Sequence, residues 1–227
     1  MPNISNTKWL ITGGTSGLGL ALTKILIEAG AKVAVVARNE KRLFDFAKTI
    51  PFIPIHADVS RKEDIYKISA QALAQLGGLD VLVNNASALG PSPLQLLVDT
   101  ECEEFEQALQ TNLLGAFRLT KAVLPTFLLQ ARGTVVNITS DASANAYPKW
   151  GAYGASKAAL DHVTRVWAEE SPGVSFYSFD PGDMDTPLHA EAVPDADRAK
   201  LRRPERSARE LLEWLATQPK SGARRSS

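Results

Sequence analysis

Residues Lys8–Gly19, KWLITGGTSGLG, decide the fold of this chain of 227 residues. The first five residues form an apolar run that predicts a short buried strand, and the strand leads directly into a loop with four glycines. Apolar residues at helical spacing follow the loop as far as Gly30. A strand, a glycine-rich loop and a helix in this order are typical of a turn that binds phosphate at the start of the helix.

Three of the four glycines have separate expected roles. Gly13 permits the tight turn, Gly17 lets the backbone approach a pyrophosphate, and Gly19 lets the helix pack closely on the strand. The alternative is an ordinary glycine-rich connection between a strand and a helix. We predict a dinucleotide site at this loop, formed by Gly13, Thr15, Ser16, Gly17, Leu18 and Gly19.

The rest of the chain repeats the alternation of apolar strands and amphipathic helices. Five further strands are predicted, at residues 32–37, 52–55, 79–83, 133–138 and 174–179. Strands that alternate with helices form parallel sheets covered on both faces. The sequence therefore predicts one α/β domain over residues 1–227, a Rossmann-like doubly wound parallel sheet with helices on both faces.

Composition and charge exclude several classes of partner. Hydrophobic residues make up 44% of the chain, charged residues 22%, and the formal net charge is zero. A nucleic acid or an anionic membrane would require a basic face, so we predict neither partner. The single cysteine, Cys102, cannot form an internal disulfide, and the start of the chain does not resemble a signal peptide. We expect a cytoplasmic protein, and we predict no metal site.

The end of the second strand carries the choice of cofactor. An acidic residue at this position would bind the ribose 2′-hydroxyl of NAD, whereas an arginine accommodates the 2′-phosphate of NADP. Here Arg38 follows the strand, and the first carboxylate is Glu40. Guanidinium pairs well with phosphate, so we predict NADP(H) rather than NAD(H). The alternative is that Arg38 is a solvated loop residue.

Polar residues also follow the other strands, at the sheet edge where ligands bind. Asp58 comes after the third strand, where it could meet an adenine amino group or simply cap a helix. Two amides, Asn84 and Asn85, follow the fourth strand, and Ala86 leaves room for a flat ligand beside them. Ser140 follows the fifth strand, and it indicates where chemistry would occur.

A phenol and an ammonium share one face of a predicted helix. Tyr153 and Lys157 are four residues apart, so their side chains are neighbours. A nearby lysine favours the phenolate and lowers the pKa of the phenol from about 10. Such a phenol can exchange a proton with a substrate oxygen near neutral pH. The alternative is an ordinary pair on a solvated helix.

Three other segments are singled out by their composition. Asn112 lies in an apolar helical stretch, where its amide needs hydrogen-bond partners. Residues 183–206 contain prolines without strand periodicity and predict a substrate lid, with a surface loop as the alternative. The polar tail, residues 220–227, is expected to fray.

Taken together, these motifs resemble the short-chain dehydrogenase/reductase family over nearly the whole chain. The matching pieces are Thr12–Gly19, Asn84-Asn85-Ala86, Asn112, Ser140, Tyr153 with Lys157, and Pro181-Gly182. The resemblance implies a catalytic set of Asn112, Ser140, Tyr153 and Lys157. It also implies that Asn112 supports a water for proton resupply, that Lys157 holds the nicotinamide ribose, and that cofactor contacts extend to Asp58, Val59, Asn85, Ala86, Pro181, Gly182 and Thr186.

Two features depart from the family pattern. Ser87 replaces the glycine of the usual Asn-Asn-Ala-Gly, a mild change that we expect to narrow the pocket. The chain also lacks the sequence of the closing strand that many members carry after the last helix; the alternative is that residues 221–225 are a remnant of that extension. That strand often helps to build a tetramer, so we expect a homodimer instead, formed through the helices around residues 105–117 and 158–167.

The sequence therefore predicts an oxidoreductase that reduces a ketone or aldehyde with NADPH, or catalyses the reverse reaction, with Tyr153 as the general acid or base. The expected substrate is a medium-sized carbonyl compound in a mostly apolar pocket. That pocket would be lined by Ala142, Tyr147, Trp150, Met184 and Leu188. Two alternatives remain: a non-catalytic NADP-binding or redox-sensing module, and an NAD-dependent alcohol dehydrogenase.

Overall fold

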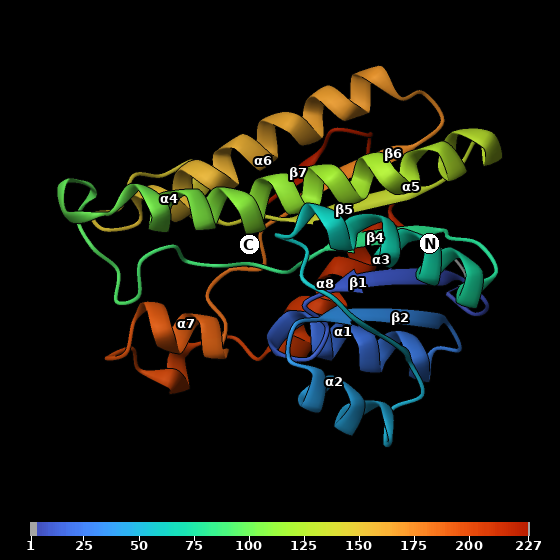
Figure 1. Ribbon diagram of the computed structural model, residues 1–227, viewed down its shortest axis with the longest axis horizontal. Helices are drawn as coiled ribbons and strands as arrows, with labels where there is room; N and C mark the ends of the chain where they lie inside the picture. The colour runs from blue at the N-terminus through green and yellow to red at the C-terminus, as the bar shows by residue number, and fades with distance from the viewer. Residues whose placement is uncertain (1–3, 227) are drawn as a thin grey trace.

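The computed structural model describes residues 4–226 as one parallel sheet between two layers of helices (Figure 1). Seven strands lie in the order β3-β2-β1-β4-β5-β6-β7, and every neighbouring pair is parallel. The strands are β1 (Lys8–Thr12), β2 (Lys32–Ala37), β3 (Ile53–His56), β4 (Val81–Asn84), β5 (Thr134–Ile138), β6 (Ser175–Phe179) and β7 (Arg224–Arg225). The predicted doubly wound sheet is confirmed.

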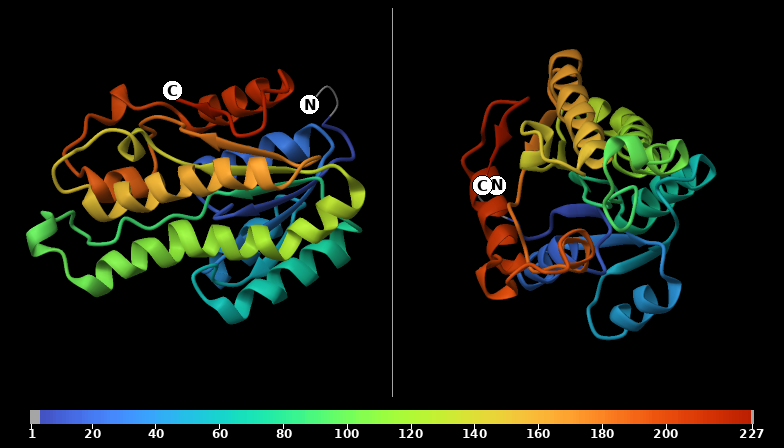
Figure 2. Two further views of the ribbon diagram at one scale, coloured as in Figure 1. Left: turned by 90° about the horizontal axis from the view of Figure 1, so that it is seen from above. Right: turned by 90° about the vertical axis from the view of Figure 1, so that its left-hand side faces the viewer.

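Helices cover both faces of this sheet (Figures 1 and 2). One face packs against α1 (Gly17–Glu28), α2 (Glu40–Ala47) and α8 (Pro204–Ala216). The opposite face packs against α3 (Lys62–Leu76), α5 (Ala116–Gln130) and α6 (Gly151–Glu170). The remaining helical segments are α4 (Cys102–Leu109), η2 (Gln110–Gly115), α7 (Pro187–Ala192) and the short turns η1 (Leu97–Asp99), η3 (Asp141–Ser143) and η4 (Arg198–Lys200).

The central strands are apolar throughout because both of their faces are buried. In β1, Trp9 and Ile11 belong to the core beneath α1, whereas Leu10 between them belongs to the core beneath α3 and α5. Successive side chains of a strand point to opposite faces, so two separate cores require a continuous apolar run. The strand with a proline, β3, lies at the sheet edge as its sequence predicted, because Pro54 has no N–H to donate.

The predicted absence of a closing strand is wrong. Residues Arg224–Arg225 form β7, which extends the sheet beyond β6. Backbone hydrogen bonds join Asp180 to Arg225 at 2.9 Å, and the Tyr177 hydroxyl donates to the Pro219 carbonyl at 2.8 Å. The tail is therefore docked as far as Ser226 rather than frayed, while Ser227 lies outside the described residues. The argument against a tetramer, which relied on a missing strand, no longer holds.

The topology creates a crevice at one edge of the sheet. Strand β1 lies between β2 and β4, so the chain crosses to opposite sides of β1 in the two halves of the fold. Loops that leave β1 and β4 diverge at their carboxyl ends, and this divergence forms a ligand site in open α/β sheets. Within residues 4–226, no helix is long and apolar enough to cross a membrane.

Candidate active site

A cavity of about 740 Å³ occupies the carboxyl edge of the sheet. Its walls come from the loops after the first six strands and from the segment that contains α7. The predicted cofactor and catalytic residues that line it are Gly13, Thr15, Ser16, Gly17, Leu18, Arg38, Asp58, Val59, Asn85, Ala86, Ser140, Tyr153, Lys157, Pro181, Gly182 and Thr186. Gly19 and Asn112 lie behind this wall rather than on it.

The glycine loop has the geometry that a phosphate-binding turn requires. Gly13 and Gly17 have φ values of +69° and +48°, which L side chains rarely adopt. A Cβ at Gly17 would lie 2.9 Å from the Thr186 methyl group, and a Cβ at Gly19 would lie 2.5 Å from the Gly13 carbonyl oxygen. The helix α1 can therefore begin against the loop only because these positions are glycine.

The start of α1 is suited to an anion. The side chain of Ser16, its N-cap residue, makes no capping hydrogen bond to any described residue, and the first turn contains no acidic side chain. Exposed N–H groups and the helix dipole favour negative charge at such an end. This end of the cavity therefore fits the phosphates of a dinucleotide.

Hydrogen bonds tie the glycine loop to β4. The Asn85 amide donates to the carbonyl oxygens of Thr12 at 2.9 Å and Gly13 at 3.2 Å. The Thr12 hydroxyl accepts from the backbone N–H groups of Asn85 and Ala86, both at 3.0 Å. The two loops at the crevice thus form one rigid floor, which explains why an asparagine follows β4.

A positively charged corner lies at the end of β2. Arg38 is 60% exposed, and its guanidinium is 3.9 Å from the carboxylate of Asp58. An exposed pair at this distance is weak and leaves the guanidinium free to bind an anion. Sequence reasoning missed a second guanidinium, that of Arg42, which lines the same cavity. The signal was its position four residues after Arg38, at the start of α2, where Asn39 caps the helix.

Ser140 begins the short turn η3 at the end of β5. Its hydroxyl donates to the Asp141 carboxylate at 3.0 Å and accepts from the Ala142 N–H at 3.2 Å. Its polar influence extends to Tyr153, because it is one of the groups that lower the pKa of that phenol against the effect of burial. The serine therefore joins the loop after β5 to α6 on the cavity wall.

Tyr153 and Lys157 are both buried on the face of α6 that lines the cavity, as their spacing predicted. The Lys157 Nζ lies 5.5 Å from the centre of the tyrosine ring and donates to the Ile138 carbonyl at 2.8 Å. Trp150 packs edge-on against the same ring. The ammonium thus lies over the ring face and anchors α6 to the end of β5.

The expected effect of the lysine on the phenol is wrong for this structure. Burial raises the pKa of Tyr153 to about 12, although hydrogen bonds from Ser87 and Ser140 act in the opposite direction. Burial also lowers the pKa of Lys157 to about 8, opposed by the charge of Asp161. Desolvation disfavours the charged form of both groups, and it outweighs the attraction that the sequence spacing suggested.

Asn112 lies in a π-helical turn between α4 and α5. Its amide nitrogen donates to the Ala88 carbonyl and to the Ser156 hydroxyl, both at 2.8 Å. Its amide oxygen accepts from the Ala88 N–H at 2.8 Å and the Ser87 hydroxyl at 3.1 Å. Two donors and two acceptor sites are the full capacity of the amide. The side chain thus ties β4 to α6 and has no hydrogen bond left for a water.

Ser87 has a larger place in the site than its sequence suggested. Its hydroxyl donates to the amide oxygen of Asn112 at 3.1 Å, and it also acts to lower the pKa of the Tyr153 phenol, so it influences two residues of the predicted catalytic set. The family glycine has no side chain that could do so. The signal was present in the sequence as a departure from the family pattern, but the partners of the hydroxyl depend on tertiary structure.

Within the predicted lid, residues 183–206, the side chains of Met184, Thr186 and Leu188 line the cavity. Thr186 caps α7 by accepting from the His189 N–H at 3.2 Å. An ion pair of 2.7 Å between Asp185 and Arg198 folds the segment back on itself. The segment is therefore an ordered wall of the site.

The predicted apolar substrate pocket forms only in part. Trp150, Met184 and Leu188 line the cavity, whereas Ala142 and Tyr147 do not. The Tyr147 hydroxyl instead donates to the Asp141 carboxylate at 2.7 Å on the outside of the loop. Among residues 4–226, no group of three or more His, Cys, Asp or Glu side chains is arranged to hold a metal ion.

The fold and the cavity define a protein class that binds a nicotinamide dinucleotide across the edge of a parallel sheet. A family model described as short chain dehydrogenase matches residues 7–197. The chain belongs to the short-chain dehydrogenase/reductase family, whose members are oxidoreductases that bind a nicotinamide cofactor.

Relatives and solved structures agree with this membership. A 2-(R)-hydroxypropyl-CoM dehydrogenase of Xanthobacter autotrophicus is 34% identical over 79% of this chain and 75% of its own. A 3-ketoacyl-(acyl-carrier-protein) reductase of Brucella melitensis complexed with NADH has a TM-score of 0.90 at 26% identity, covering 99% and 97% of the two chains. A short chain dehydrogenase of Shigella flexneri complexed with NADP has the same TM-score at 25% identity, with 99% and 98% covered.

Proposed function

We propose that this protein reduces a ketone or aldehyde to an alcohol with NADPH, or catalyses the reverse oxidation. The observation that carries the proposal is that Ser140, Tyr153 and Lys157 line the same cavity as the glycine loop. A hydroxyl, a phenol and a cation beside a dinucleotide site are the groups that carbonyl reduction needs. The dehydrogenase and reductase names of the relatives support the same chemistry.

The protein groups hold the substrate oxygen and supply its proton. When substrate binds, the Ser140 hydroxyl turns its one proton from the Asp141 carboxylate to the carbonyl oxygen, and it stabilises the negative charge that develops there. Tyr153 gives its proton to that oxygen in the reduction and removes it in the oxidation. The nicotinamide cofactor, when bound, supplies or accepts the hydride. Lys157 places a positive charge next to the phenol and favours its anionic form after the proton has left.

The preference for NADP(H) is supported by the charges at the end of β2. Arg38 and Arg42 line the cavity together, and the strand that precedes them ends in Ala37 without a carboxylate. Two guanidinium groups suit a 2′-phosphate, because each can donate paired hydrogen bonds to it. Asp58 and Val59, on the neighbouring loop, would hold the adenine ring.

Reversal of charge at Arg38 tests the cofactor preference. In Arg38→Asp, the carboxylate repels the 2′-phosphate and can accept a hydrogen bond from a ribose hydroxyl. We expect the ratio of kcat/KM for NADPH over NADH to fall by about 100-fold, equivalent to about 2.7 kcal/mol. Arg132→Asp, an exposed substitution on another part of the surface, is the control. An unchanged ratio in Arg38→Asp would contradict the assignment of NADP(H).

The pH dependence of the reduction should follow Lys157. Because burial lowers its pKa to about 8, the ammonium is present below that pH and is lost above it. Tyr153, with a pKa of about 12, remains protonated across this range. We therefore expect kcat/KM for reduction to be constant near pH 7 and to fall about tenfold per pH unit above pH 8. A profile that stays flat to about pH 10 would contradict a role for the lysine charge.

The proposal is tested by NADPH oxidation with a panel of ketones and aldehydes of graded size. Consumption of NADPH with formation of the matching alcohol supports it. NADPH binding without turnover on any compound would instead support a non-catalytic NADP-binding or redox-sensing module. Turnover with NADH alone would support the NAD-dependent alcohol dehydrogenase.

We further propose that the protein acts in the cytoplasm as a homodimer. Helices α5 and α6 contact each other, since the ring of Phe117 on α5 stacks on that of Trp167 on α6 with 5.8 Å between the ring centroids. Val166 on α6 and Leu129 at the end of α5 expose 39% and 90% of their surface. Exposed apolar side chains on neighbouring helices support association through this face. Light scattering of the purified protein measures the number of subunits.

A further inference from the structure

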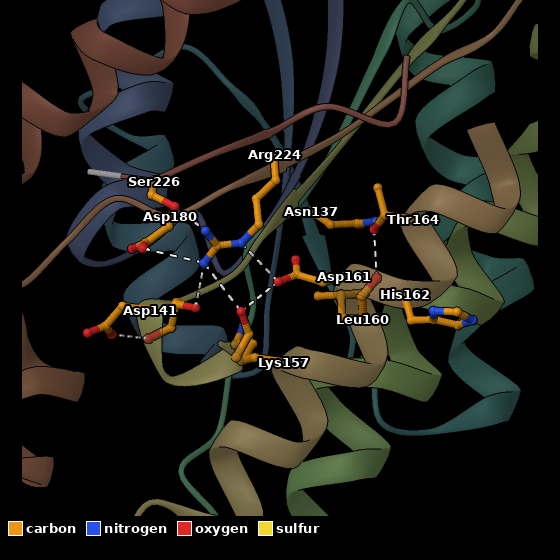
Figure 3. A network of polar contacts seen from close by, with 12 residues as sticks. Asn137, Asp141, Lys157, Leu160, Asp161, His162, Thr164, Asp180, Arg224 and Ser226 are labelled. Atoms are coloured by element: carbon orange, nitrogen blue, oxygen red, sulfur yellow. Dashed lines mark hydrogen bonds and ion pairs between the residues drawn. The ribbon is translucent and has the colours of Figure 1, made fainter. Parts of the chain in front are cut away.

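An arginine of the docked tail extends into the active-site wall. Arg224 lies on β7, and its side chain points toward α6 and the loop that carries Ser140 (Figure 3). The guanidinium donates through Nη2 to the Ser140 carbonyl oxygen at 3.0 Å and to the Ser143 hydroxyl at 3.3 Å. The side chain is only 23% exposed. One residue of the last strand thus holds both ends of the turn that begins at Ser140.

The same guanidinium forms ion pairs with two buried carboxylates. Its Nε lies 3.1 Å from Asp161 on α6, and its Nη2 lies 3.6 Å from Asp180 at the end of β6. The side chains of these aspartates are 7% and 3% exposed, and within residues 4–226 their ion pairs are both with Arg224. Asp161 also accepts from the Ser143 hydroxyl at 2.6 Å. The loop, α6 and the end of β6 therefore meet at a single positive charge.

This cluster is positioned to control the geometry of the catalytic groups. Asp161 is one helical turn beyond Lys157 on α6, and Asp180 lines the cavity. The orientation of the Ser140 hydroxyl depends on the backbone of the turn that follows it. Asp161 Oδ1 and Asp180 Oδ2 are buried and accept no hydrogen bond from any described residue, so the ion pairs with Arg224 are what offset these buried charges, and loss of the arginine would release the turn.

We propose that Arg224 is a positioning residue for Ser140, which fixes the turn at residues 140–143 by holding its backbone and by joining Asp161 and Asp180. The inference rests on the proposed function, because it assigns Ser140 to the substrate oxygen. It adds that the last strand is part of the active site's support, so the tail is required for turnover and not only for the closure of the sheet.

Arg224→Met tests the proposal, with Arg225→Met as the matched control. Arg225 belongs to the same strand, but its guanidinium contacts the Glu210 carbonyl on α8, away from the cavity wall. We expect kcat to fall by about tenfold to 100-fold in Arg224→Met, while KM for NADPH stays within about twofold, because a misplaced group slows chemistry without altering the phosphate site. Arg225→Met should keep both values. Equal kinetics of the two variants, or wild-type kcat in Arg224→Met, would overturn the proposal.

Backbone hydrogen exchange gives a reading that does not depend on activity. The Ser143 N–H donates to the Ser140 carbonyl that Arg224 also binds. Amides of residues 141–145 should exchange faster in Arg224→Met than in Arg225→Met, and equal rates would contradict the proposal.

If Arg224→Met does not fold, Arg224→Lys takes its place as the test variant. The lysine ammonium keeps the positive charge but cannot form the same set of hydrogen bonds as the guanidinium. Arg224→Lys should keep KM for NADPH and lose kcat, and full kcat in that variant would overturn the proposal.

The failure of the proposed function can be distinguished from the failure of the role assigned to Arg224. If the wild type reduces no carbonyl compound, the proposed function fails, and the exchange rates of the two variants still decide whether Arg224 holds the turn.

Discussion

Replacement of Tyr153 by phenylalanine is expected to lower kcat for carbonyl reduction by about 10²- to 10⁴-fold, the usual contribution of a general acid. The ring remains, so its packing against Trp150 and the fold of α6 should persist. Only the phenol hydroxyl, whose pKa Ser87 and Ser140 act to lower, is lost. The substrate oxygen then has no proton donor of suitable position. Steady-state kinetics with NADPH measure this loss.

Two further measurements accompany this variant. The Kd for NADPH should change by less than about threefold, because the phosphate and adenine contacts lie elsewhere in the cavity. Tyr66→Phe is the matched control, since Tyr66 is 72% exposed on α3, and its turnover should equal that of the wild type. If Tyr153→Phe keeps kcat within about tenfold of the wild type, another group donates the proton and our assignment of the general acid is wrong.

Lys157→Met is expected to remove activity while leaving the fold intact. Without the ammonium, the phenolate that forms when Tyr153 releases its proton has no adjacent positive charge, and we expect kcat to fall by at least about 10²-fold. Methionine has a similar length and fits the buried site without a charge. Turnover should therefore fall in this variant, whereas the free energy of unfolding should not.

The stability argument follows from the pKa of the lysine. Burial lowers the pKa from 10.5 to about 8, so keeping the ammonium in the folded protein at pH 7 costs about 3 kcal/mol relative to the unfolded chain. Removal of the lysine relieves this cost but leaves the Ile138 carbonyl without its donor, a loss of about 1–3 kcal/mol. We therefore expect the free energy of unfolding at pH 7 to be equal or higher in Lys157→Met.

The sign of the pH dependence provides a second test of the same variant. The folded pKa of Lys157 is lower than the unfolded value, so the unfolded chain binds more protons between about pH 8 and pH 10.5 and stability rises with pH. Between pH 7 and about pH 9.5 this group should contribute a rise of about 2 kcal/mol in the wild type, and Lys157→Met should lack it. Urea unfolding at the two pH values measures the difference. Parallel behaviour of the two proteins would show that the lysine is not desolvated.

The fold could be predicted because its signals are local. Continuous apolar runs identify strands that are buried on both faces, and the loop from Gly13 to Gly19 fixes the first crossover. The position of the site followed from the same reasoning, since the carboxyl ends of parallel strands meet at one edge. Residues as distant in sequence as Arg38 and Ser140 therefore line one cavity, as expected.

The last strand could not be predicted, because its signal is not local. Arg224 and Arg225 carry no apolar pattern, and two residues are too few to show alternation. The tail docks through hydrogen bonds that involve Tyr177, Ser221 and Asp180, which are distant contacts of the folded chain. A pattern search that scores apolar periodicity therefore assigns the segment to a frayed end.

The pKa values of the site residues could not be predicted from their spacing in the sequence. A separation of four residues correctly puts Tyr153 and Lys157 together, but the pKa of each depends on desolvation, which the sequence does not report. The π-helical turn that contains Asn112 could not be predicted from spacing either. A π-helical turn contains one residue more than an α-helical turn, and this changes which side chains of the helix face the sheet. The four hydrogen bonds of the Asn112 side chain include those to Ser87 and Ser156.

The most direct test of the account is hydride transfer itself. The protein is incubated with NADPH that carries deuterium at the transferring carbon of the nicotinamide, together with ketones and aldehydes of graded size, and the products are analysed by mass spectrometry. We expect deuterium on the carbinol carbon of at least one alcohol with the wild type and much less of it with Tyr153→Phe. NADPH binding without deuterated alcohol from any substrate would contradict the assignment as a carbonyl reductase.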